Sequence, residues 1–174
     1  MKKYFIIFAL VLAVSLGLFL TFAPAILDEE QNVVVEHQAY EISDQAQQLH
    51  SSLLIGDWHA DSLLWMRNLS EQYDYGHLDF PRMQQGNMAL QMFTTVTKSP
   101  SGQNYERNSS DASDNITLLA MAQRWPAATW TSLAERALFQ ADKLYKLAAR
   151  DPDNLMLIRS RIELAELLKR RQSN

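Results

Sequence analysis

His59 and Asp61 stand two residues apart, directly after the short apolar run of residues 53–56. In an extended chain, side chains at positions i and i+2 leave the same face of the strand, so the imidazole and the carboxylate are expected to converge just beyond the strand. An imidazole nitrogen and a carboxylate oxygen are ordinary ligands of zinc. The spacing therefore predicts a pair of metal ligands at the carboxyl end of a strand that is buried on both faces.

A His-x-Asp sequence has a second interpretation, in which the aspartate caps a helix and the histidine is incidental. The sequence contains another example, His77-Leu78-Asp79. Here Asp79 stands where a helix N-cap is needed, Pro81 is tolerated in the first turn, and Gly86 suits the end of a short helix. We therefore assign this second motif to helix capping.

Two further apolar runs indicate strands that would accompany the first. Residues 88–96 are rich in strand-forming side chains, and a helical stretch separates them from residues 53–56. This order predicts a βαβ unit with a parallel sheet. Residues 155–158 predict a third short strand.

The polar segment 98–113 predicts a long loop at the carboxyl end of the second strand. In an α/β barrel, the loops at that end form the rim of the active site. Tyr105 and Arg107 are placed to reach a substrate from such a loop, and the alternative is a solvated loop without that role.

Apolar residues at helical spacing predict several helices. They are expected over residues 36–52, 114–125, 132–150 and 161–171, with a short helical or turn segment over 62–68. Ser132 with Glu135 and Ser160 with Glu163 form capping boxes. The expected buried face of the longest helix consists of Leu133, Ala137, Leu138, Ala141, Leu144, Tyr145 and Ala148. His37 and His50 flank the first helix and are interpreted as solvated.

The N-terminal residues 4–22 form an apolar span preceded by Lys2 and Lys3. A helix of this length is about what is needed to cross a bilayer core of roughly 30 Å. The cationic flank is expected to stay in the cytoplasm, which places the rest of the chain outside it, in the periplasm if the host is bacterial. The alternative is a secreted protein released by cleavage at the small-x-small sequence Ala23-Pro24-Ala25. The span exceeds the ~7 to 15 residues of a signal-peptide core, which favours an uncleaved anchor.

Composition limits the chemistry and the partners. The 174 residues include no cysteine, so a metal must be held by His, Asp and Glu. The formal net charge is -4. Without residues 1–27, which hold two lysines and no acid, 14 basic residues face 20 acidic ones, a net charge of -6. This balance argues against nucleic acid as a partner.

The order of these segments resembles the start of the membrane dipeptidase family, the renal-dipeptidase-like zinc peptidases. The resemblance includes the strand with His59 and Asp61, the following Ser-Leu-Leu-Trp-Met-Arg, and the segment Gly-His-Leu-Asp-Phe-Pro-Arg-Met-Gln-Gln-Gly-Asn-Met-Ala-Leu-Gln-Met-Phe. It is collinear from about residue 53 to the C-terminus. It implies an α/β fold of the (β/α) TIM-barrel kind, of which this chain would supply the first three strands.

The resemblance also implies the site and the activity. In the family, two zinc ions hydrolyse dipeptides inside the barrel, and the enzyme can form a homodimer. The His and Asp of the first strand hold one metal, a Glu on a later strand bridges both metals, and two further His complete the set. His59 and Asp61 match the first pair. Glu135, Glu163 and Glu166 fall on expected helices and do not match the bridging Glu.

We expect three parts: a membrane anchor over residues 1–27, a tether and helix over 28–52, and the N-terminal part of the barrel over 53–174. The hypothesis is a truncated, membrane-anchored zinc dipeptidase that is inactive alone, since two ligands are too few for a catalytic zinc. The metal could also be a neighbour of zinc in the affinity series. A second hypothesis is a membrane-tethered helical binding module without catalysis. A third is that a separate chain supplies the missing strands.

Overall fold

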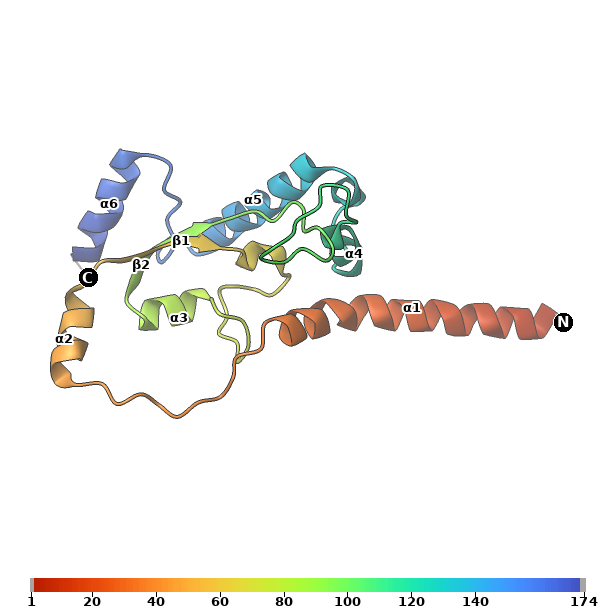
Figure 1. Ribbon diagram of the computed structural model, residues 1–174, viewed down its shortest axis with the longest axis horizontal. Helices are drawn as coiled ribbons and strands as arrows, with labels where there is room; N and C mark the ends of the chain where they lie inside the picture. The colour runs from red at the N-terminus through yellow and green to blue at the C-terminus, as the bar shows by residue number, and fades with distance from the viewer. Residues whose placement is uncertain (1, 173–174) are drawn as a thin grey trace.

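The computed structural model describes residues 2–172 and combines helices with a parallel sheet (Figure 1). In chain order the elements are α1 (Lys2–Gln31), α2 (Asp44–Ser52), β1 (Ile55–Ala60), the 3-10 turn η1 (Ser62–Leu64), α3 (Phe80–Gln85), β2 (Met88–Phe93), α4 (Asn115–Ala122), the 3-10 turn η2 (Ala127–Trp130), α5 (Leu133–Arg150) and α6 (Arg161–Gln172). The fold is therefore a mixed α/β fold with one N-terminal apolar helix.

The sheet consists of β1 and β2, which pair in parallel with α3 on the connection between them. Gly56 pairs with Leu90, and Ala60 pairs with Phe93. This arrangement confirms the expected βαβ unit. Because the strands are parallel, their carboxyl ends lie at the same edge of the sheet, where polar side chains from both can meet.

The expected third strand is wrong for the described residues. Residues 155–158 have no regular secondary structure and form no ladder with β2. A cavity of about 450 Å³ is lined by residues of β2 on one side and by residues 154–158 on the other. The described sheet therefore has two strands, and the expected three-stranded start of a barrel is not formed.

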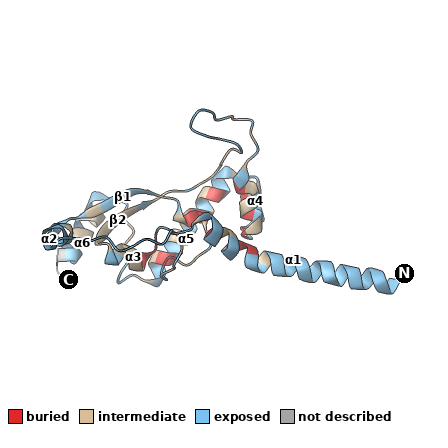
Figure 2. Cartoon of the chain, turned by 60° about the horizontal axis from the view of Figure 1, so that its bottom comes forward, coloured by how far each residue is buried: buried red, intermediate tan, exposed pale blue. Residues whose placement is uncertain are grey.

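The expectation that the first strand is buried on both faces is also wrong. The residues of β1 are half-buried or exposed, and Trp58 is 67% exposed. Figure 2 shows the sheet in the colours of intermediate and exposed residues, whereas buried residues gather around α4 and α5. Two strands with few helices against them cannot enclose either face of the sheet.

The second strand ends at Phe93, three residues before its expected end. The backbone of Val96 forms hydrogen bonds with a side chain rather than with a neighbouring strand. The side-chain amide of Gln140 on α5 accepts from Val96 N at 3.1 Å and donates to Val96 O at 3.0 Å. This amide thus takes the place of a neighbouring strand three residues beyond the end of β2.

Capping residues set the helix ends. The helix expected over residues 36–52 begins only at Asp44, because the Ser43 hydroxyl accepts a hydrogen bond from Ala46 N at 3.2 Å and caps it there. Residues 33–43 before it form no helix or strand. Asp79 caps α3 by accepting from Arg82 N at 2.9 Å, and Gly86 ends this helix, as expected.

The long helix α5 begins after Ser132 as expected, and four residues of its expected apolar face, Ala137, Ala141, Leu144 and Ala148, are half-buried. Its most deeply buried residues, however, lie beside that face. Arg136, Gln140 and Leu147 are buried, whereas Leu133, Leu138 and Tyr145 of the expected apolar face are exposed. The buried polar side chains satisfy backbone carbonyls of irregular segments, which would otherwise be buried without partners. Arg136 alone donates to carbonyls of η2 and of the segment after β2.

Two small apolar clusters meet at η1. One contains Leu63, Leu69, Phe80 and Leu147, and the other contains Leu64, Ile116, Ala120 and Trp125. Consecutive leucines of the same turn thus belong to different clusters. Since η1 begins one residue after Asp61, both clusters hold the end of β1 in place.

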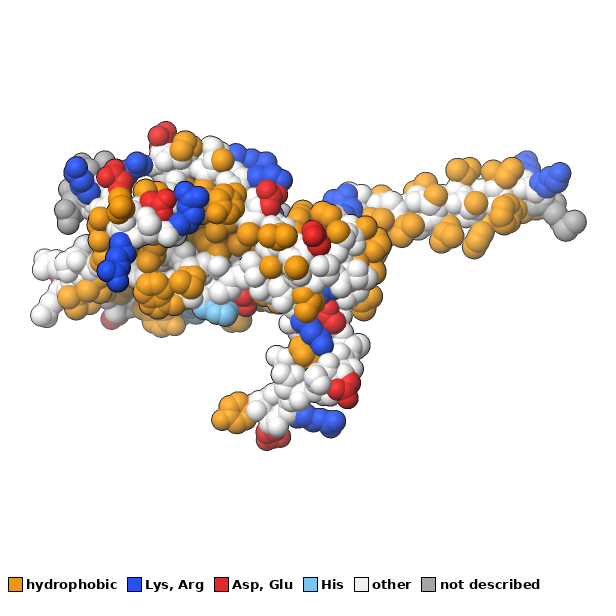
Figure 3. Space-filling model, turned by 90° about the horizontal axis from the view of Figure 1, so that it is seen from above, with side chains coloured by type: hydrophobic (Ala, Val, Ile, Leu, Met, Phe, Trp, Pro, Cys, Tyr) orange, Lys and Arg blue, Asp and Glu red, His pale blue; other side chains and the backbone are white. Residues whose placement is uncertain are grey.

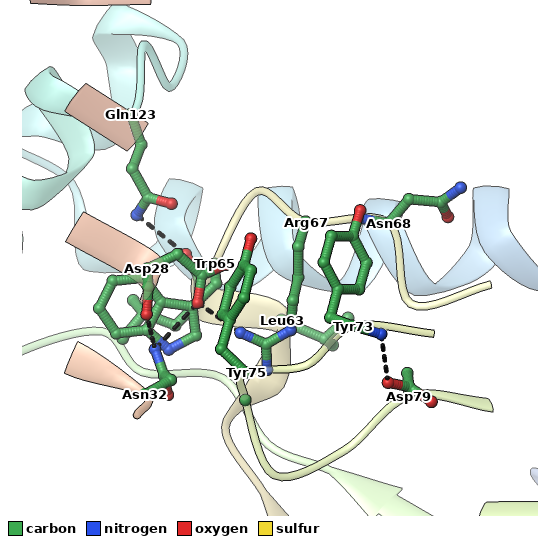
Figure 4. A network of polar contacts seen from close by, with 12 residues as sticks. Asp28, Asn32, Leu63, Trp65, Arg67, Asn68, Tyr73, Tyr75, Asp79 and Gln123 are labelled. Carbon is green, nitrogen blue, oxygen red and sulfur yellow. Dashed lines mark hydrogen bonds and ion pairs between the residues drawn. The ribbon is translucent and has the colours of Figure 1, made fainter. Parts of the chain in front are cut away.

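The helix α1 is long and apolar enough to span a bilayer, and it is the one such helix in the part of the chain that the structure describes. It continues to Gln31, so residues 28–31 are helical rather than part of a tether. Its last turn packs onto the globular part, where Asp28 forms an ion pair with Arg67 (Figure 4).

Candidate metal centre

The structure brings His59 and Asp61 together at the carboxyl end of β1. His59 lies on the strand, and Asp61 follows it at the N-cap position of η1. The distance from His59 Nε2 to Asp61 Oδ2 is 3.3 Å. The predicted convergence of the two side chains is thus present. Their side chains are 70% and 47% exposed, so both are open to solvent.

The end of β2 orients the carboxylate of Asp61. Thr94 N donates to Ala60 O at 2.9 Å, which extends the pairing between the strands by one residue. The hydroxyl of the same Thr94 donates to Asp61 Oδ1. One carboxylate oxygen is therefore held by the neighbouring strand, and the other faces the imidazole.

A third polar side chain, Asp57, belongs to this edge of β1 and was not among the predicted ligands. Its Oδ2 accepts from Gln91 Nε2 on β2 at 2.7 Å, and its Oδ1 accepts from His59 N at 3.3 Å. The hydrogen bond from the Gln91 amide and, more weakly, the one from the His59 backbone amide lower the pKa of Asp57. The i, i+2 alternation that singled out His59 and Asp61 could have found Asp57 as well.

The geometry of the pair fits a shared metal. Two ligands of one tetrahedral zinc, each about 2.1 Å from the ion, lie about 3.4 Å apart. His59 Nε2 and Asp61 Oδ2 are separated by 3.3 Å. The same distance also permits a direct hydrogen bond, which is the contact present here. The two atoms could therefore bind one ion with little rearrangement.

The described residues contain no group of three or more His, Cys, Asp or Glu side chains that could hold a metal ion. A catalytic zinc usually has three protein ligands. The cavity beside β2 is not part of this site, because its lining includes Trp58 but neither His59 nor Asp61. The pair is thus a partial site at an open sheet edge.

The other candidate residues lie elsewhere. His77 is exposed and Asp79 is a helix cap, as expected. Tyr105 is fully exposed on the loop, at 105% of its reference area, and points into solvent. Glu163 binds Arg159 N and the Ser160 hydroxyl at the start of α6, which is the expected cap.

Comparison with protein families, curated proteins and solved structures found no match to this chain.

Asp114 closes the long loop that follows β2. Its Oδ1 accepts from Ser99 N at 3.0 Å and Ile116 N at 3.1 Å, and its Oδ2 accepts from Arg136 at 2.5 Å. Burial alone would raise the pKa of Asp114, but these hydrogen bonds lower it from 3.8 to about 2. Hydrogen bonds to this one carboxylate thus hold the two ends of the loop together.

The lowered pKa of Asp114 predicts a loss of folding stability in acid. Since its folded pKa lies below the unfolded one, its contribution is complete above about pH 4 and is lost as the pH falls toward 2. After allowing for solvent screening, the contribution is about 1 to 2 kcal/mol. Urea unfolding of the detergent-solubilised chain from pH 5 to 2 measures it. In Asp114→Asn, the free energy of unfolding should change less between pH 5 and 2, by that amount. A variant whose unfolding free energy depends on pH as steeply as that of the native chain would contradict the role given to Asp114.

Proposed function

We propose that this chain carries the first metal ligands of a membrane-bound metallo-dipeptidase, the activity that its resemblance implies. The observation that supports the proposal is the 3.3 Å approach of His59 Nε2 to Asp61 Oδ2 at the carboxyl ends of two parallel strands. In α/β proteins, active sites lie at that edge of the sheet. In this proposal, β1 and β2 are the first two strands of a (β/α) barrel.

In this proposal the chain's own residues hold and orient the ion. His59 Nε2 and Asp61 Oδ2 are the ligand atoms, and Thr94 fixes the other oxygen of Asp61. Asp57 accepts a hydrogen bond from His59 N and so stiffens the strand at the ligand. A bound zinc pair would activate a water molecule and polarise the scissile peptide carbonyl. The remaining ligands would come from protein outside the described residues.

We propose further that α1 anchors the protein in a membrane as a single span. Lys2 and Lys3 would stay on the cytoplasmic side, and the metal ligands would lie on the other side. The burial of Ala23 and Pro24 supports an uncleaved helix, because cleavage after Ala25 would remove both residues from the end of α1 that packs on the globular part. A secreted form would keep Asp28 but lose the span.

Metal binding tests the proposed site. We expect His59→Ala and Asp61→Asn to weaken cobalt or zinc binding by on the order of tenfold each, since each removes one of two ligands. Isothermal titration of the metal into the full chain in detergent measures this effect.

His77→Ala is the matched control, because His77 belongs to the second His-x-Asp sequence, His77-Leu78-Asp79, and is exposed. It should bind the metal like the native chain. Equal losses in the His59 and His77 variants, or no binding by the native chain, would refute the site.

Activity tests the expectation that the ligand set is partial. Because a catalytic zinc usually has three protein ligands, we expect no dipeptide hydrolysis by the pure 174-residue chain at stoichiometric zinc. Hydrolysis that is lost in the His59→Ala variant would show that the described ligands suffice.

A membrane-tethered binding module is the second candidate function. The cavity of about 450 Å³ beside β2 favours it, since its apolar lining is typical of binding pockets and excludes the proposed ligands. In that case His59→Ala would keep both the fold and the bound partner, whereas the peptidase proposal requires a loss of metal binding.

A further inference from the structure

One face of α1 is docked onto the globular part. Its half-buried and buried residues are spaced by three and four positions, which places them on one side of the helix. They are Leu20, Ala23, Pro24, Leu27 and Asp28, and the other described residues of α1 are exposed. This docked stripe contacts α4 and ends at the ion pair with Arg67.

The docked stripe begins at Leu20, in the last turn of the apolar span, and continues beyond the span to Asp28. Residues 4–22 make a helix about 28 Å long, which matches a hydrocarbon core of roughly 30 Å. The next six residues, 23–28, rise about 9 Å further, through the headgroup layer. Any element packed against Ala23 and Pro24 therefore lies at the level of the lipid headgroups.

The element at that level, α4, presents apolar side chains to the outside. Ile116 and Ala120 are buried in the core, whereas Leu118 is 72% exposed and Met121 is 37% exposed. Figure 3 shows hydrophobic side chains gathered where α1 leaves the globular part, on the side that looks along α1 toward its N-terminus. An exposed apolar surface of this kind beside a membrane helix fits lipid as its partner.

We propose that α4 lies in the headgroup layer of the bilayer, with Leu118 and Met121 in contact with lipid. The partner is the membrane in which α1 itself is inserted, so this inference rests on the proposed anchor. The contact would hold the globular part against the membrane at a defined height, together with the Asp28–Arg67 pair.

Depth-dependent quenching tests the contact. The chain has no cysteine, so Leu118→Cys can be labelled with a single environment-sensitive fluorophore. The full chain is reconstituted in vesicles of phosphatidylcholine and phosphatidylglycerol with or without lipids that carry a shallow spin label. We expect the spin-labelled lipids to quench position 118 by roughly twofold or more, because an interfacial helix places its apolar face ~5 to 10 Å deep.

Ile162→Cys is the matched control, since Ile162 is 83% exposed and apolar. It lies on α6, at the opposite end of the globular part from the N-terminus of α1 (Figure 1). This position should be quenched by aqueous iodide and unaffected by the labelled lipids.

The outcomes separate the contact from the anchor. Intact mass and resistance to carbonate extraction show whether α1 is retained. An intact, membrane-inserted chain in which position 118 behaves like position 162 overturns the lipid contact alone. A label at 118 that neither iodide nor labelled lipid reaches shows that protein covers α4, for instance a second copy, and also overturns it. A product without α1 overturns both proposals.

Discussion

Replacing Asp28 with asparagine is expected to lower the free energy of unfolding by about 3 to 5 kcal/mol, because Arg67 would remain charged and buried without a carboxylate partner. Both side chains of this ion pair are only 2% exposed. Asn32 Nδ2 donates to Asp28 Oδ1 at 2.9 Å, and the guanidinium lies 6.0 Å from the centre of the Tyr75 ring (Figure 4). The pair therefore sits in an enclosed polar network.

The chain packs closely against the Arg67 guanidinium at Gly76. A Cβ placed on Gly76 would lie 2.6 Å from the Arg67 guanidinium carbon, and the backbone of Gly76 has φ of +73°. The glycine thus lets the chain approach the guanidinium closely. This tight packing is the reason for expecting a large effect from a single charge.

The pair between Asp142 and Lys146 provides the matched control for Asp28→Asn. It is similar in kind but exposed, with side chains 52% and 64% accessible. Asp142→Asn should change stability by less than about 1 kcal/mol. Urea unfolding of both variants in the same detergent measures the difference. Equal effects would mean that the Asp28 pair does not hold α1 to the globular part.

The second large effect is expected from Arg136→Met, which should cost about 3 to 5 kcal/mol. Arg136 is 1% exposed. Its guanidinium donates to Thr129 O and Thr97 O at 2.6 Å, Trp130 O at 2.9 Å, the Thr117 hydroxyl at 2.8 Å and the Asp114 carboxylate at 2.5 Å. Methionine has a similar volume but donates none of these bonds, so several buried acceptors lose their partner.

Hydrogen exchange locates the expected damage. Ser99 N donates to Asp114, whose other oxygen is bound by Arg136. The amide of Ser99 should therefore exchange faster in Arg136→Met, along with a lower urea midpoint. Arg159→Met is the control, because Arg159 is 65% exposed and pairs with Glu163 on the surface. A similar loss in both variants would contradict the role of Arg136 as the link between α5 and the loop.

Local sequence determined the helix ends and the candidate ligand pair. Asp79, Ser132 and Ser160 each stand at a helix start in the structure, because a capping side chain binds the backbone amide three residues later. His59 and Asp61 converge because the alternation of an extended chain decides the direction of side chains two apart. These features depend on neighbours a few residues away, which the sequence shows directly.

Tertiary contacts decided what the periodicity of the sequence could not. The apolar spacing of α5 predicted one buried face, but the most deeply buried side chains include the polar Gln140 and Arg136, because they satisfy the backbone at Val96 and Thr97 about 40 residues earlier. Residues 155–158 have the composition of a strand but no ladder with β2, since pairing requires a neighbour in space rather than a favourable composition. Asp28 was expected in a tether, yet Arg67 binds it across the fold. Contacts between residues far apart in the chain decide these features, because burial is a property of the assembled fold.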